Sequence, residues 1–160
     1  MTEAKKQFER VQRTYIRVLD NRNRKFVEYE DDAWDFILNC WHLKDWIKND
    51  FEGVAKATRN KIDAEVNAHP ALVMVGDLAN RSKHLQVMSS VSKAETAQHT
   101  QSTATGYVHV ASKDGTQKTG QGDEVVLMLV VDKSGEKVLI RKLATEAMKN
   151  WMAIIKKYRI

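Results

Sequence analysis

Residues Asp77 to His84, with the sequence DLANRSKH, bring an acid, an amide, two cations and an imidazole into eight positions. An imidazole can act as a general acid or base, and a cation can hold a phosphate or stabilise developing negative charge. On a helix, at about 100° per residue, Asp77, Asn80, Arg81 and His84 fall within an arc of roughly 100°. Asp77 lies about 10 Å along the axis from His84, too far for a hydrogen bond. Any catalytic triad here needs a residue from elsewhere in the chain.

The segment CWHLKDW (40–46) is the natural source of that residue. His42 and Asp45 are three positions apart and share a helix face. On the helical wheel His42 falls in the middle of the polar arc, which favours a solvated position. Asp45 falls at the edge of the apolar arc, where a carboxylate can be partly buried and orient an imidazole. We therefore expect these two residues and the DLANRSKH face to meet in a common cleft.

Three functions are compatible with that cleft. In a binding protein, Lys83 and Arg81 would engage the phosphate of RNA or of a nucleotide, with Asn80 and His84 orienting it. In an enzyme, His84 would be the acid or base of RNA cleavage. In a protein-interaction module, which could be a homodimer, the polar residues would be structural. The simplest structural alternative is a solvated face with an Asp77–Arg81 ion pair.

Other chemistry finds little support in the sequence. The stretch GTQKTGQG (115–122) has the glycine spacing of a phosphate loop but lacks the lysine and the helix that must follow, so we expect a hairpin loop. The histidines show no paired ligand spacing, and Cys40 lies on an apolar helix arc. We expect neither a metal nor another cofactor.

Charge is distributed unevenly along the 160 residues, whose net charge is +5. Residues 1–25 carry eight Lys or Arg against three acids, residues 133–160 carry eight against two, and residues 26–53 carry eight acids against two lysines. The basic ends could form a patch that attracts phosphates. Alternatively, the basic first helix and the acidic second helix neutralise each other. With no signal peptide and no run of apolar residues long enough for a bilayer, we expect a cytoplasmic protein without a membrane partner.

Periodicity predicts one α+β domain over residues 1–160, with helices in 1–86, strands in 87–142 and a last helix over 144–158 capped by Thr145. The four expected N-terminal helices cover about 3–19, 31–48, 59–68 and 70–86, the second beginning at Asp31 and Asp32. Residues 89–105 suggest a loop or an edge strand. The strands are expected at GYVHVAS, at EVVLMLVV and at EKVLIRK after a DKSG turn, all antiparallel, with EVVLMLVV covered on both faces.

The two polar segments resemble those of a group of small bacterial proteins. That group pairs His-x-x-Asp-Trp, here His42, Asp45 and Trp46, with Asp-(Ile/Leu)-Ala-Asn-x-x-Lys-His, here residues 77–84. Gly76 stands where the group often has an arginine. A looser resemblance is to HEPN domains, which implies metal-independent RNase activity through Arg81 and His84. Here His84 lies three positions after Arg81, whereas the histidine of the HEPN pattern lies four to six positions after its arginine.

Overall fold

A computed structural model describes residues 1–83, 100–104, 110–111, 117–118, 125–131 and 137–160. Over these residues the chain is mainly helical with antiparallel strands, an α+β arrangement. The helices are α1 (Glu3–Leu19), α2 (Phe26–Asn49), α3 (Lys56–Arg59), α4 (Ile62–Asn67), α5 (Pro70–Lys83) and α6 (Ile140–Tyr158). The strands are β1 (Thr100–Ala104), β2 (Val110–Ala111), β3 (Gln117–Lys118), β4 (Val125–Val131) and β5 (Lys137–Leu139). Among the described helices none is both long and apolar enough to cross a membrane.

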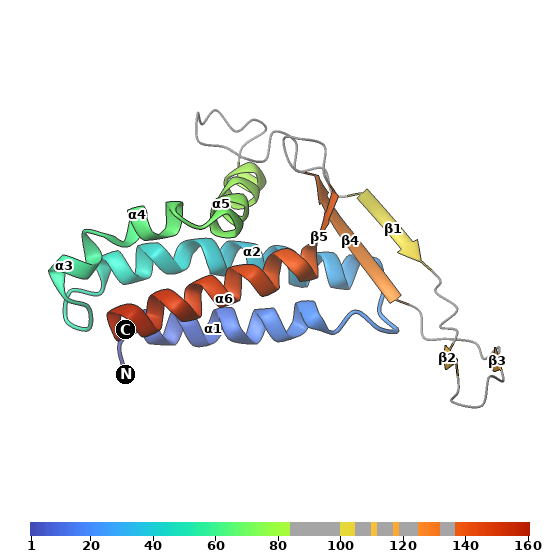
Figure 1. The fold of residues 1–160 in the computed structure, drawn as a ribbon, viewed down its shortest axis with the longest axis horizontal. Coiled ribbons are helices and arrows are strands. Elements are labelled where there is room, and N and C mark those ends of the chain that lie inside the picture. The colour runs from blue at the N-terminus through green and yellow to red at the C-terminus, as the bar shows by residue number, and fades with distance from the viewer. Residues whose placement is uncertain (84–99, 105–109, 112–116, 119–124, 132–136) are drawn as a thin grey trace.

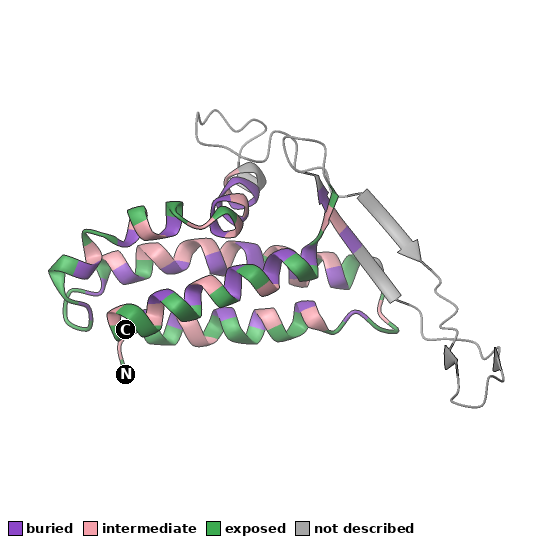
Figure 2. Ribbon diagram, viewed as in Figure 1, coloured by how far each residue is buried: buried purple, intermediate pink, exposed green. Residues whose placement is uncertain are grey.

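Three long helices, α1, α2 and α6, lie side by side, and α5 crosses over α2 and α6 (Figure 1). The first helix begins where Thr2 accepts a hydrogen bond from the Lys5 amide at 3.2 Å. Its buried residues recur every three or four positions, so one face points into the core (Figure 2). Two of those buried residues, Gln7 and Thr14, are polar.

The sheet has the order β1-β4-β5, with antiparallel pairing throughout, and β2 pairs with β3 separately. Met128 and Val130 of β4 are buried, and this strand contacts α2 and α6. Leu129, between them, is only partly buried, and its β5 partner Leu139 is 39% exposed. At Leu129, therefore, the face turned away from the helices is less covered than expected.

Several expected boundaries were wrong. The N-terminal part has five helices, not four, because the expected helix over 59–68 is shortened to α4 and an unexpected short helix, α3, precedes it. The second helix begins at Phe26, which leaves Asp31 and Asp32 inside it, and Asp32 pairs with arginines instead.

At the C-terminal end, α6 begins at Ile140, and Thr145 lies within it, donating to the Arg141 carbonyl at 2.8 Å. Of the described residues of the run EKVLIRK, therefore, three belong to the sheet, Lys137–Leu139. Within 89–105, where a loop or an edge strand was expected, residues 100–104 form the edge strand β1. Within 115–122, where a hairpin loop was expected, residues 117–118 form β3. The expected DKSG turn and most of GYVHVAS lie outside the described residues.

Candidate functional site

The first half of the DLANRSKH segment is buried. It lies in α5, where Leu72, Val75, Leu78 and Ala79 are all 2% exposed or less, as expected for a helix that begins apolar on every side. Asp77 is itself only 7% exposed, so the alternative of a solvated face does not hold at this residue. The burial follows from the position of α5, which packs against α2, α4 and α6. Asn80, one turn further on, is partly buried.

The second half of the segment is only partly described. Arg81, Ser82 and Lys83 form the last turn of α5, but their side chains lie outside the described part of the structure, as does His84. The pairing of Asn80 with His84 and the phosphate contacts of Arg81 and Lys83 therefore stay predictions.

The two polar segments meet through Trp41 and Gly76. A Cβ atom built on Gly76 would lie 2.6 Å from Cη2 and 2.7 Å from Cε3 of the Trp41 indole, so only glycine lets α5 approach α2 this closely. Lys44 Nζ lies over the same indole, 3.7 Å from the ring centroid. The segments around residues 41 and 76 are thus neighbours, as the expected cleft requires.

His42, however, lines a groove between α2 and α1. The groove has a volume of about 380 Å³ and is lined by Gln7, Arg10, Leu38, Asn39, His42 and Trp46. His42 is partly buried, where the wheel placed it in the solvent, because α1 covers that side of α2. Asp45 is also partly buried, as expected, but does not line this groove.

A buried amide organises the floor of the groove. Gln7, 3% exposed, donates from Nε2 to the backbone carbonyl and to the side-chain oxygen of Asn39, at 3.2 Å each. Its own oxygen accepts a hydrogen bond from Arg10 at 3.4 Å. Asn39 in turn donates to the Asp35 carbonyl at 2.7 Å. Because these bonds satisfy the buried amide, it can hold the Arg10 guanidinium at the mouth of the groove.

Along the α1–α2 junction, the charges form ion pairs at the end that carries Arg17 and Arg24, but not at the groove. Arg17 pairs with Asp32 at 2.6 Å and with Asp35 at 3.0 Å, and Arg24 pairs with Asp32 at 2.6 Å. Partial burial would raise the pKa of Asp32, but the hydrogen bonds from the two arginines hold that pKa below its ordinary value. Neutralisation of the basic first helix by the acidic second helix is thus seen here. Among the described residues, no acid pairs with Arg10.

Trp46 also lines a second hollow, of about 370 Å³. It is lined by Glu3, Trp46, Asn49, Asp50, Phe51 and Glu52. Asp50 is occupied there: it accepts hydrogen bonds from the Ala4 amide at 2.9 Å and the Gly53 amide at 2.7 Å, and these bonds lower its pKa. This carboxylate therefore fixes the start of α1 against the end of α2.

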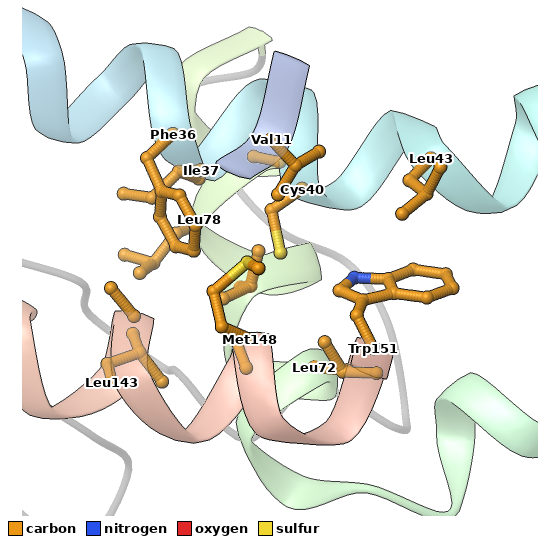
Figure 3. Packing of buried hydrophobic residues seen from close by; sticks show 14 of the residues in the cluster. Val11, Phe36, Ile37, Cys40, Leu43, Leu72, Leu78, Leu143, Met148 and Trp151 are labelled. Carbon is orange, nitrogen blue, oxygen red and sulfur yellow. The ribbon is translucent and has the colours of Figure 1, made fainter. Parts of the chain in front are cut away.

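Cys40 is unsuited to nucleophilic chemistry. Burial raises the pKa of its thiol to about 12. Figure 3 shows the Trp151 indole nitrogen turned towards Cys40 within the apolar core. That indole N–H has no hydrogen-bond partner among the described atoms. The cysteine therefore belongs to the packing of α2 against α6.

Sequence reasoning missed Arg10 and Gln7, and it noted Trp46 only as part of a motif. The signal that could have found this site is Gln7 itself. A glutamine at a core position of an amphipathic helix needs a polar partner on a neighbouring helix. Within the described ranges, no group of three or more His, Cys, Asp or Glu residues is placed to hold a metal ion.

The fold and the groove define a mainly helical α+β protein with a polar and aromatic groove between its first two helices. No family model, curated protein or solved structure matches this chain.

Proposed function

We propose that this protein binds a phosphate-bearing ligand, RNA or a nucleotide, in the groove between α1 and α2. The observation that carries the proposal is the convergence of Arg10, His42 and the 39% exposed indole of Trp46 on one hollow. Sites for single-stranded nucleic acid combine cations that follow the phosphates with aromatic rings that stack on the bases. This groove contains both, with Arg10 as the cation and Trp46 as the aromatic ring.

Each side chain has a distinct role in the proposal. Arg10 gives one of its five N–H donors to Gln7, which leaves a fork of donors for a phosphate. His42 can supply a further hydrogen bond to the same phosphate. Trp46 lies one helical turn from His42, about 6 Å along the axis, and offers its exposed ring to the base. That separation suits the ribose that joins base and phosphate.

The surrounding charge supports attraction of a polyanion. α1 packs against α6, so the two helices that carry most of the basic residues of 1–25 and 137–160 are neighbours in space. Exposed cations on these helices include Lys5, Arg13, Lys156 and Arg159. Such a field raises the rate of association with nucleic acid and weakens as salt is added.

This proposal relocates the site that the sequence favoured. Asp77 is buried, which withdraws its carboxylate from a ligand at the surface. His42 belongs to both versions of the site. Arg81, Lys83 and His84 could still extend the phosphate contacts, and their role stays a prediction.

The test is a pair of matched variants measured with a fluorescently labelled single-stranded RNA. Arg10→Ala and Arg13→Ala remove the same charge from the same helix, but only Arg10 lines the groove. We expect Arg10→Ala to weaken binding more than Arg13→Ala. Trp46→Ala should raise the Kd about 5- to 150-fold, since stacking on an aromatic side chain contributes about 1–3 kcal/mol per base. If the two arginine variants lose the same RNA affinity and Trp46→Ala loses none, RNA is attracted only by the general positive charge of the protein, and the groove is not the binding site.

The RNase and interaction alternatives have their own tests. His84→Ala that abolishes RNA cleavage at an unchanged melting temperature would favour the HEPN-like enzyme, in which Asn80 and Asp45 would assist. If His84→Ala and Asn80→Ala unfold the protein, the segment is structural. A homodimer or protein partner is favoured by the partly exposed apolar residues Leu129 and Leu139 of the sheet, and would appear as a mass above one chain in solution.

A further inference from the structure

The indole of Trp46 lies between two hollows of opposite character. On the side of His42, the lining carries the cation Arg10. On the other side, the lining carries the carboxylates of Glu3, Asp50 and Glu52 and no cation. A ligand stacked on this ring would therefore meet hydrogen-bond donors at one end and acceptors at the other.

The acceptor side is available to a ligand mainly through Glu52. Both oxygens of Asp50 are engaged with backbone amides, and Glu3 pairs with Lys6 at 2.5 Å. Asn49 donates to the Asp45 carbonyl at 2.9 Å, which leaves its side-chain oxygen as an acceptor. Glu52 is exposed, and within the described part of the chain no hydrogen bond or ion pair involves it.

The second aromatic ring helps to define the shape of this hollow. Phe51 is 71% exposed, and the Arg59 guanidinium lies 4.3 Å from its ring centroid. Arg59 also donates to the Val54 carbonyl at 3.1 Å, which anchors the cation. One face of Phe51 is thus covered, and of the two rings only Trp46 lines both hollows.

We propose that the ligand base is guanine, an inference that rests on the proposed function. Guanine presents two adjacent donors, N1–H and the N2 amino group, along the edge opposite its sugar-linked ring. A single carboxylate accepts both in parallel, as it does from an arginine fork. Adenine and cytosine place an unprotonated ring nitrogen beside their amino group, and this nitrogen would face the carboxylate. Uracil places a carbonyl on either side of its one N–H.

The same charges set the orientation of the ligand. The carboxylate of Glu52 repels a phosphate, and Arg10 attracts one. The phosphate therefore lies towards Arg10 and His42, and the edge of the base towards Glu52. A bidentate contact of this kind discriminates against a wrong base by about 5- to 150-fold.

The experiment measures the affinity of the wild-type protein for GMP, AMP, CMP and UMP by calorimetry. We expect GMP to bind best. Glu52→Gln should lower GMP affinity, because an amide offers one acceptor oxygen in place of two, and should raise AMP affinity, because its NH2 group can donate to the ring nitrogen that the carboxylate repels. Glu9→Gln makes the same charge change on α1 outside both hollows, and should leave the preference intact.

The outcomes separate this inference from the function it rests on. Equal binding of all four nucleotides by the wild-type protein would overturn the guanine assignment and leave the phosphate-binding groove standing. A guanine preference that survives in Glu52→Gln would also overturn it. If none of the nucleotides and no RNA binds, both proposals fail.

Discussion

Replacing Gly76 with alanine should destabilise the protein, although alanine is the better helix former. The added Cβ would lie 2.6–2.7 Å from two carbons of the Trp41 indole, well inside van der Waals contact. Overpacking of this kind costs about 1–3 kcal/mol, while exchange of glycine for alanine within a helix returns about 1 kcal/mol. We expect a net loss of up to about 2 kcal/mol, or a fall in Tm of up to about 8 °C for a chain of this size.

The assay is equilibrium unfolding in urea, read as a shift of the midpoint at constant slope. A double-mutant cycle with Trp41→Leu isolates the contact, because removal of the indole leaves space for the methyl group. In the Trp41→Leu background, Gly76→Ala should be neutral or stabilising by up to about 1 kcal/mol. An equal cost in both backgrounds, or a stabilised Gly76→Ala protein, would refute the argument from close packing.

Two further predictions concern buried titratable groups. The pKa of Asp50 is lowered by its bonds to the amides of Ala4 and Gly53, so its stabilisation is present above the ordinary pKa of a carboxyl and is lost as pH falls through the lowered value. Asp50→Ala should lose at least about 1.5 kcal/mol at neutral pH, the contribution of one hydrogen bond to a charged group, and should show a weaker loss of stability in acid. Cys40, with its pKa raised to about 12 by burial, should react with a thiol reagent at pH 8 only as fast as the protein unfolds globally; fast labelling of the native protein would contradict its place beside Trp151.

The helices that the sequence predicted best are those with a local start signal and a clear stripe. α1 begins at Glu3, as expected, because Thr2 caps it and its apolar residues keep one face. The start of α2 was misplaced because Asp31 and Asp32 look like capping residues, whereas Asp32 is used for pairing with Arg17 and Arg24. This pairing depends on where α1 packs, which cannot be predicted from the residues around Asp32.

The end of the sheet was misjudged for a related reason. The run VLIRK alternates like a strand, but Ile140, Leu143 and Ala144 share one helix face and are all buried. For so short a run the two periods cannot be told apart, and the core that receives these side chains decides between them.

The sequence by itself determined that the chain forms amphipathic helices and an antiparallel sheet, that α5 is deeply buried at its start, and that Cys40 faces the core. Only the tertiary structure decided which polar residues meet. It withdrew Asp77 from solvent, brought His42 beside Arg10 and Trp46, and gave Gly76 its close contact. Periodicity is a property of neighbouring residues, whereas the neighbours of a polar side chain depend on which helix packs against it. The groove therefore appears only once α1 lies along α2.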